Sequence, residues 1–75
     1  MIHAREDYNR FQDPDNKIPQ NEPVFLFRAQ DKHFIKVLKY YQFLLWEDSP
    51  TSSIIDLIDK HIELSKDWPT KTPDV

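Results

Sequence analysis

The most regular feature of the chain is an apolar repeat that runs through residues 32–46. Apolar side chains recur there at spacings of three and four, which places them on one face of a helix. This face consists of Phe34, Val37, Leu38, Tyr41, Leu44 and Leu45. Four more apolar residues widen this face: Ile35, Tyr40, Phe43 and Trp46. Three lysines lie on the opposite side of the helix: Lys32, Lys36 and Lys39. We therefore predict a helix over residues 32–46 that its own chain covers on one side and a partner covers on another.

A second helix is predicted over residues 50–66. Its expected inner side is Ile54, Leu57, Ile58, His61, Ile62 and Leu64, with Trp68 closing the end. Ser49 followed by Pro50 suits an N-cap and a first-turn proline. The short connection between the two helices predicts an antiparallel hairpin. Residues 67–75 contain two prolines and are expected to form a loosely held tail.

A strand is predicted over residues 24–29, because this stretch is rich in β-branched and aromatic side chains. Residues 1–23 read as an extended arm, with a turn at residues 13–16. No second convincing strand exists, and a buried strand cannot leave its backbone groups unpaired. Either the arm pairs with residues 24–29, or the same strand of another copy does. The second alternative favours a homo-oligomer.

The predicted fold class is α+β and mainly α: an extended arm and one short strand, followed by the helical hairpin. The chain has 75 residues and therefore forms a single small domain. It contains no cysteine, so disulfides cannot compensate for a modest core. Homo-oligomerisation is the remaining route to stability, and we expect it to complete the fold.

Composition excludes several kinds of site. The chain has no glycine, which phosphate-binding loops of the P-loop and dinucleotide types require. Its three histidines have no metal-ligand spacing, and its serines lie in no glycine elbow. We expect no metal, no cofactor and no enzymatic activity. No run approaches the roughly 18 apolar residues of a membrane span, and no signal peptide opens the chain, so a cytoplasmic protein is expected.

Charge is distributed unevenly along the chain. Residues 27–46 carry four basic side chains and one acidic one, whereas both flanking stretches are net acidic. This pattern has two interpretations: charge matching within or between subunits, or a local anion site. Lysines 32, 36 and 39 beside Tyr40 could also follow a phosphate backbone. The acidic flanks would repel a polyanion within a Debye length of about 10 Å, so nucleic acid is disfavoured as a partner.

The candidate ligand-binding residues lie where the predicted strand meets the first helix. They are Arg28, Gln30, Asp31, Lys32 and His33. A helix N-terminus offers free backbone N–H groups to small anions, and an arginine adds a forked donor. In the alternative interpretation, Asp31 only caps its own helix while Arg28 pairs with an acidic residue. The flanking arms are expected to add Arg5, Tyr8, Arg10 and Lys71.

A subunit interface is expected on the strand and on the outer side of the first helix. Its candidate residues are Val24, Phe25, Phe27, Tyr40, Phe43 and Trp46. If strands pair across a two-fold axis, two basic clusters approach each other and form an intersubunit pocket. The same aromatic surface permits a second function, which is to bind and inhibit or recruit another protein.

Three stretches of the chain match a recurrent pattern. They are "HAREDYNRFQDP" at residues 3–14, "IPQNEPVFLFRAQD" at 18–31 and "WPTKTPD" at 68–74. They resemble very small proteins encoded by bacteriophages and prophages, whose motifs read HARxDYxRxQDP, IPxxEPVFLxRAQD and WPxKxPD. The resemblance brackets almost the whole chain. It departs at Phe11 and Phe27, where a smaller or more polar residue is expected.

The resemblance implies a viral origin and the host bacterial cytoplasm as the location. It carries no established activity. Small phage proteins without catalytic equipment commonly act by binding: they block a host protein, assist replication or assembly, or sequester a host signalling nucleotide and so evade host defence. By analogy with the last group, the leading hypothesis is a homo-oligomer that holds a small anionic ligand between its subunits.

Overall fold

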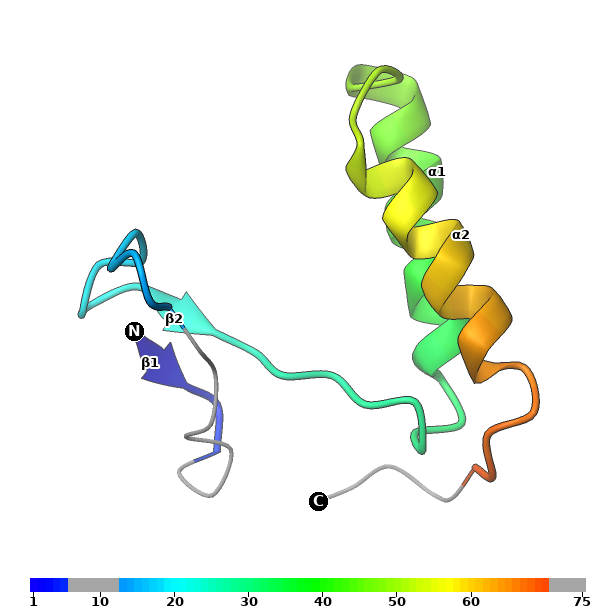
Figure 1. Ribbon diagram of the computed structural model, residues 1–75, viewed down its shortest axis with the longest axis horizontal. Coiled ribbons are helices and arrows are strands. Elements are labelled where there is room, and N and C mark those ends of the chain that lie inside the picture. Colours follow the sequence, from blue (N-terminus) through cyan, green and yellow to red (C-terminus); the bar gives the residue numbers. More distant parts are fainter. Residues whose placement is uncertain (6–12, 71–75) are drawn as a thin grey trace.

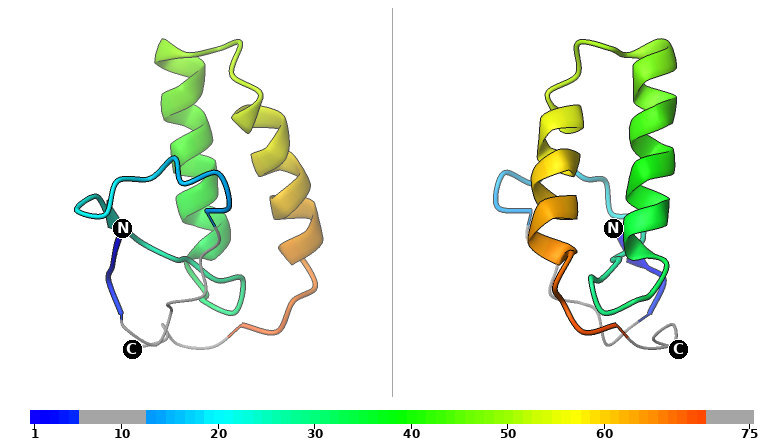
Figure 2. Two further views of the ribbon diagram at one scale, coloured as in Figure 1. Left: turned by 60° about the vertical axis from the view of Figure 1, so that its left-hand side comes forward. Right: turned by 90° about the vertical axis from the view of Figure 1, so that its right-hand side faces the viewer.

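The computed structural model describes residues 1–5 and 13–70. Within them, two helices form an antiparallel hairpin, and a short pair of strands lies to one side of it (Figure 1). The elements are β1 (Ile2–His3), β2 (Pro23–Val24), α1 (Phe34–Asp48) and α2 (Ile54–Ser65). The mainly helical α+β class predicted from the sequence is confirmed. In both views of Figure 2, α1 begins and α2 ends at the same end of the hairpin.

The two strands pair in parallel, with Ile2 opposite Pro23 and His3 opposite Val24. The Ile2 N–H donates to the Glu22 carbonyl at 2.7 Å, and the Ala4 N–H donates to the Val24 carbonyl at 3.2 Å. The N-terminal arm thus pairs with the predicted strand, which was the first of the two alternatives. Backbone pairing at Val24 therefore requires no second copy of the chain.

The strand is shorter than the predicted residues 24–29. It ends at Val24, and residues 25–28 form no regular secondary structure. The strand is short because its partner strand, β1, ends at His3, after which the chain bends. A strand extends only as far as a neighbour supplies hydrogen bonds, whatever its own propensity.

The predicted turn at residues 13–16 is confirmed. The Asn16 N–H donates to the Asp13 carbonyl at 3.0 Å. The Asp13 carboxylate accepts from the N–H groups of Lys17, at 2.9 Å, and Ile18, at 2.8 Å. Asn16 has a φ of 53°, in the left-handed region that asparagine tolerates better than most residues. Asparagine takes the role that glycine has in most such turns.

Both helices begin later than predicted. Residues 28–31 and 31–34 form two successive turns, and regular helix starts at Phe34 instead of residue 32. The second helix starts at Ile54 instead of residue 50, because residues 50 and 51 form a turn. The predicted N-cap at Ser49 is wrong: its N–H donates to the Leu45 carbonyl and ends α1. The hydroxyl of Ser52 accepts from the Ile54 N–H at 3.2 Å instead.

The core lies along the seam between the helices and is narrow. Its buried side chains are Phe34, Ile55, Ile58, Ile62, Gln42 and Ser65. Phe27 packs against Phe34 with ring centroids 5.2 Å apart, which ties the segment before α1 to this core. Four residues that the sequence placed on the inner side of the second helix are exposed: Ile54, Leu57, His61 and Leu64. Trp68 is 57% exposed and does not close the end of the helix. Two helices in contact bury one stripe each, so the remaining apolar residues stay outside.

Candidate functional site

The predicted ligand-binding residues of the chain centre lie in the loop that leads into α1. Arg28, Lys32 and His33 are exposed, while Gln30 and Asp31 are half-buried. The structure therefore groups three side chains that can carry positive charge at the start of a 15-residue helix, where the helix dipole adds to their field. Their role in binding stays a prediction.

Asp31 organises this loop. Its Oδ1 accepts from the His33 N–H at 2.8 Å, and its carbonyl accepts from the Phe34 N–H at 3.0 Å. Its own N–H donates to the Arg28 carbonyl at 3.0 Å. The carboxylate thus satisfies a backbone donor of the turn before the helix. Asp31 is not the N-cap of α1, which is His33 and has no side-chain capping bond, so the predicted cap lies two residues too early. The Asp31 carboxylate also places a negative charge in the cluster. An anion bound there must therefore be held by the neighbouring side chains.

Arg5 follows β1, and residues 25–28 follow β2. Because the two strands run in parallel, both segments leave the strand pair at the same end. The other three predicted arm residues, Tyr8, Arg10 and Lys71, lie outside the described residues.

The predicted interface residues have different surroundings. Val24 and Phe27 are half-buried within their own chain, the first in the strand pair and the second against Phe34. Phe25 is the most exposed of the set, at 75%. The three aromatic residues of α1 are between 51% and 64% exposed: Tyr40, Phe43 and Trp46. The rings of Tyr40 and Phe43 lie 6.4 Å apart and form a small aromatic patch.

Gln42, which was not among the predicted site residues, is 5% exposed at the centre of the hairpin. Its Nε2 donates to the Ile55 carbonyl at 3.0 Å and to Asp59 Oδ1 at 2.7 Å. A usable signal was present, because Gln42 continues the four-residue spacing of Phe34 and Leu38 on the face that α2 covers. A polar residue in that series indicates a specific hydrogen bond between the helices.

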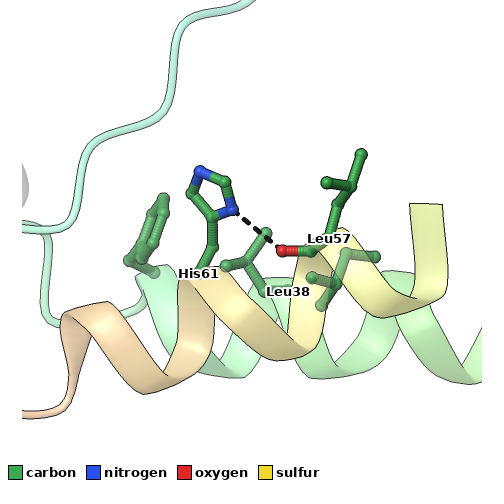
Figure 3. A pocket seen from close by; sticks show the side chains of 5 residues that line it. Leu38, Leu57 and His61 are labelled. Atoms are coloured by element: carbon green, nitrogen blue, oxygen red, sulfur yellow. Dashed lines mark hydrogen bonds between the residues drawn. The ribbon is translucent and has the colours of Figure 1, made fainter. Parts of the chain in front are cut away.

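The seam opens into a shallow apolar groove on one side of the hairpin, with a volume of about 140 Å³. It is lined by Phe34, Leu38, Leu57, Ile58 and His61. Figure 3 shows Leu57 and His61 projecting from α2 beside Leu38 of α1. His61 Nδ1 lies 2.8 Å from the Leu57 carbonyl, so this nitrogen carries a hydrogen that it donates.

The opposite side of the seam holds a larger and more polar hollow of about 500 Å³. It is lined by Lys39, Gln42, Trp46, Asp59, Ile62, Glu63 and Lys66. Lys66 Nζ and Glu63 Oε2 lie 2.9 Å apart, and this hydrogen-bonded carboxylate raises the pKa of Lys66. Two basic and two acidic side chains line the hollow, so it has no dominant formal charge.

Residues 1–5 and 13–70 contain no cluster of three or more side chains suited to a metal ion. Over the same residues, neither helix is long and apolar enough to cross a membrane. No protein-family model, curated protein or solved structure matches the chain.

Proposed function

We propose that this is a non-enzymatic binding protein that works as a homo-oligomer and holds a small anionic ligand in a pocket between subunits. A phage-type sponge for a host signalling nucleotide is the form of this function that the sequence resemblance favours. The observation that carries the proposal is the amount of apolar surface left uncovered. Leu57 is 54% exposed and Leu64 is 66% exposed, although both belong to the same amphipathic helix as the core.

Uncovered apolar surface of this kind supports binding over catalysis. A chain of this size has few walls with which to enclose a substrate, whereas a contiguous apolar patch on a small protein marks an interaction site. A second subunit would add the missing wall. The basic cluster at the start of α1 would then contribute charge to the pocket.

The ligand class follows from the groups around that cluster. The side chains of Arg28, Lys32 and His33 are exposed at the positive end of α1. The guanidinium of Arg28 is suited to the paired oxygens of a phosphate or carboxylate, and Gln30 offers both a donor and an acceptor to a base or amide edge. Together these groups favour a compact phosphate ester over a long polyanion.

Thermal shift measurements on the full chain test this function. Linear and cyclic nucleotides and inorganic phosphate are added singly, while light scattering monitors the oligomer. A ligand at 100 times its dissociation constant stabilises the folded state by roughly 2.7 kcal/mol, which is readily detected. Arg28→Ala and Lys32→Ala should reduce the shift, and the matched control Lys17→Ala, directly after the 13–16 turn, should not. An intact oligomer that no nucleotide or phosphate stabilises contradicts the proposal.

A protein–protein interaction module is the second candidate, and the exposed aromatic residues of α1 favour it. Tyr40 and Phe43 form a patch that no described part of the chain covers. Aromatic side chains are enriched among the residues that dominate protein interfaces. In this case Tyr40→Ala or Phe43→Ala should abolish capture of the target protein, while Arg28→Ala leaves it intact.

A further inference from the structure

The hollow bordered by Lys39, Asp59 and Lys66, which we call the polar hollow, lies between the two helices. Seven side chains line it, three from α1 and four from α2. Within each helix they have neighbours three or four residues away, so each set occupies one helix face. The volume of about 500 Å³ falls in the range of small-molecule sites, which is roughly 300–1,000 Å³. The polar hollow is therefore large enough for a small metabolite.

Gln42 is the most buried of these side chains, at 5% exposed, and its amide is held rigidly. Both hydrogens of Nε2 are used, because this atom donates to the Ile55 carbonyl and to Asp59 Oδ1. The other end of the amide, Oε1, accepts no hydrogen bond within the described part of the chain. No atom of the described buried side chains is both fully enclosed and without a partner, so Oε1 is accessible from the hollow. Gln42 thus presents a fixed, unused acceptor to anything bound there.

Asp59 and Lys39 each bring to the polar hollow a charge that no described residue neutralises. They lie on different helices, and neither has an ion-pair partner within residues 1–5 and 13–70. Asp59 accepts from Gln42 through Oδ1, which leaves Oδ2 open to another donor. Glu63 and Lys66, by contrast, pair with each other at 2.9 Å. A bound molecule with one positive and one negative end would therefore pair with both isolated charges.

Trp46 gives the polar hollow an aromatic wall. It lies one helical turn beyond Gln42, and a helical side chain leans toward the N-terminus of its own helix, so the indole leans back toward Gln42. The side chain is 54% exposed, which leaves part of the ring free for contact. An aromatic face attracts a cation, and a planar guanidinium also stacks on it. A planar cation with several N–H donors can therefore contact Trp46, Gln42 Oε1 and Asp59 Oδ2 together.

The two ends of the polar hollow differ in chemistry. Lys39 lies two helical turns from Trp46, which is roughly 10 Å along the axis of α1. Its side chain leans toward the start of α1 and away from the indole. One end thus has the ring and the acceptors, and the other has an ammonium group. Because the lining has no net formal charge, it favours a ligand that carries both signs over a polyanion.

We propose that the polar hollow binds a small zwitterion of the arginine type, with a guanidinium at one end and a carboxylate at the other. Trp46, Gln42 and Asp59 bind the guanidinium, and Lys39 binds the carboxylate. All four residues belong to one chain, so the site is complete without a second subunit. It is distinct from the basic cluster at the start of α1 and goes beyond the proposed function.

The fluorescence of Trp46 in the full chain tests the ligand class. The chain has two tryptophans, so Trp68→Phe leaves Trp46 as the only one. L-Arginine should change this fluorescence in a saturable manner at millimolar or lower concentration. L-Citrulline, in which an uncharged urea group replaces the guanidinium, should bind at least about tenfold more weakly because it loses the charge-assisted hydrogen bonds. Equal affinity for the two compounds, or no saturable change with arginine, overturns the inference.

Substitutions in the same single-tryptophan chain test the contacts. Asp59→Asn retains an oxygen for the Gln42 hydrogen bond but replaces the second acceptor with an amide N–H₂ group. It should weaken arginine binding at least about tenfold while the helical circular dichroism stays intact. The matched control, Asp56→Asn, removes a charge from the same helix outside the hollow and should leave the affinity unchanged. Lys39→Gln should weaken the binding of arginine but not of agmatine, which lacks the carboxylate. Arginine affinity that is unchanged in both Asp59→Asn and Lys39→Gln overturns the inference.

Discussion

Gln42 of α1 and Asp59 of α2 are joined by a hydrogen bond of 2.7 Å in the middle of the helical hairpin. The same Nε2 also donates to the Ile55 carbonyl at 3.0 Å, so one amide group holds both the backbone and a side chain of α2. Only a single alignment of the helices brings Ile55 and Asp59 together opposite Gln42. The pair therefore fixes the register of two helices whose other buried contacts are apolar and less directional.

Gln42→Ala should lower the free energy of unfolding by about 1–3 kcal/mol, because it removes two hydrogen bonds between the helices, one of them to the Asp59 carboxylate. Urea unfolding followed by circular dichroism measures the change. Lys66→Gln is the matched control, since it removes an ion pair whose Lys66 and Glu63 side chains are 57% and 73% exposed. Such a pair contributes little, so the control should leave the midpoint unchanged. Equal losses in the two variants would contradict this account.

Ile58→Ala should be among the most destabilising single substitutions. Ile58 is 5% exposed in the seam, and truncating a buried isoleucine costs about 2–5 kcal/mol. A domain of this kind has a total stability of about 5–15 kcal/mol, so the loss is a substantial share of it and should lower the melting temperature by about 8 °C or more. Thermal unfolding measures the loss. Phe25→Ala serves as the control, because Phe25 is 75% exposed, and a comparable loss in that variant is the result that would refute the prediction.

Asn16→Ala should destabilise the 13–16 turn by about 1–2 kcal/mol, because alanine tolerates a φ of 53° poorly. Asn16→Gly is the informative companion, since glycine accepts this conformation without steric cost. Melting temperatures of both variants provide the measurement. The prediction requires that glycine retain most of the stability that alanine loses.

Two substitutions at Asp31 separate its hydrogen bond to the His33 N–H from its charge. Asp31→Asn keeps a side-chain oxygen that can accept from the His33 N–H, whereas Asp31→Ala removes the acceptor. Alanine should cost about 0.5–2 kcal/mol of stability and asparagine much less. If the basic cluster binds an anion, Asp31→Asn should also tighten phosphate binding by removing a like charge, as measured by calorimetry. Weaker binding in Asp31→Asn would mean that the carboxylate belongs to the site.

Local signals in the sequence predicted much of the fold. Two amphipathic helices, the hairpin between them and the turn at Asp13 all follow from interactions over three to five residues, which the sequence displays directly. The element boundaries were less accurate. Regular helix begins at Phe34 and Ile54, after turns whose geometry depends on how the chain enters the hairpin.

The candidate site was predicted only as a cluster. Residues 28–33 are consecutive, so the sequence alone brings Arg28, Lys32 and His33 together. It predicted that Asp31 would cap the first helix; the carboxylate does accept from the His33 N–H, but in the turn before α1. Gln42 was not predicted, because the hydrogen bonds of a single polar residue in an apolar series can be assigned only when the atoms opposite it are known.

The sequence by itself determined which segments are helical and that they carry more apolar surface than a chain of this length can bury. Only the tertiary structure decided which stripe of each helix is inside, that Ile2–His3 pairs with Pro23–Val24, and which side of the hairpin remains apolar. The physical reason is that periodicity reports the width of an apolar face, whereas burial depends on where a second helix lies against it.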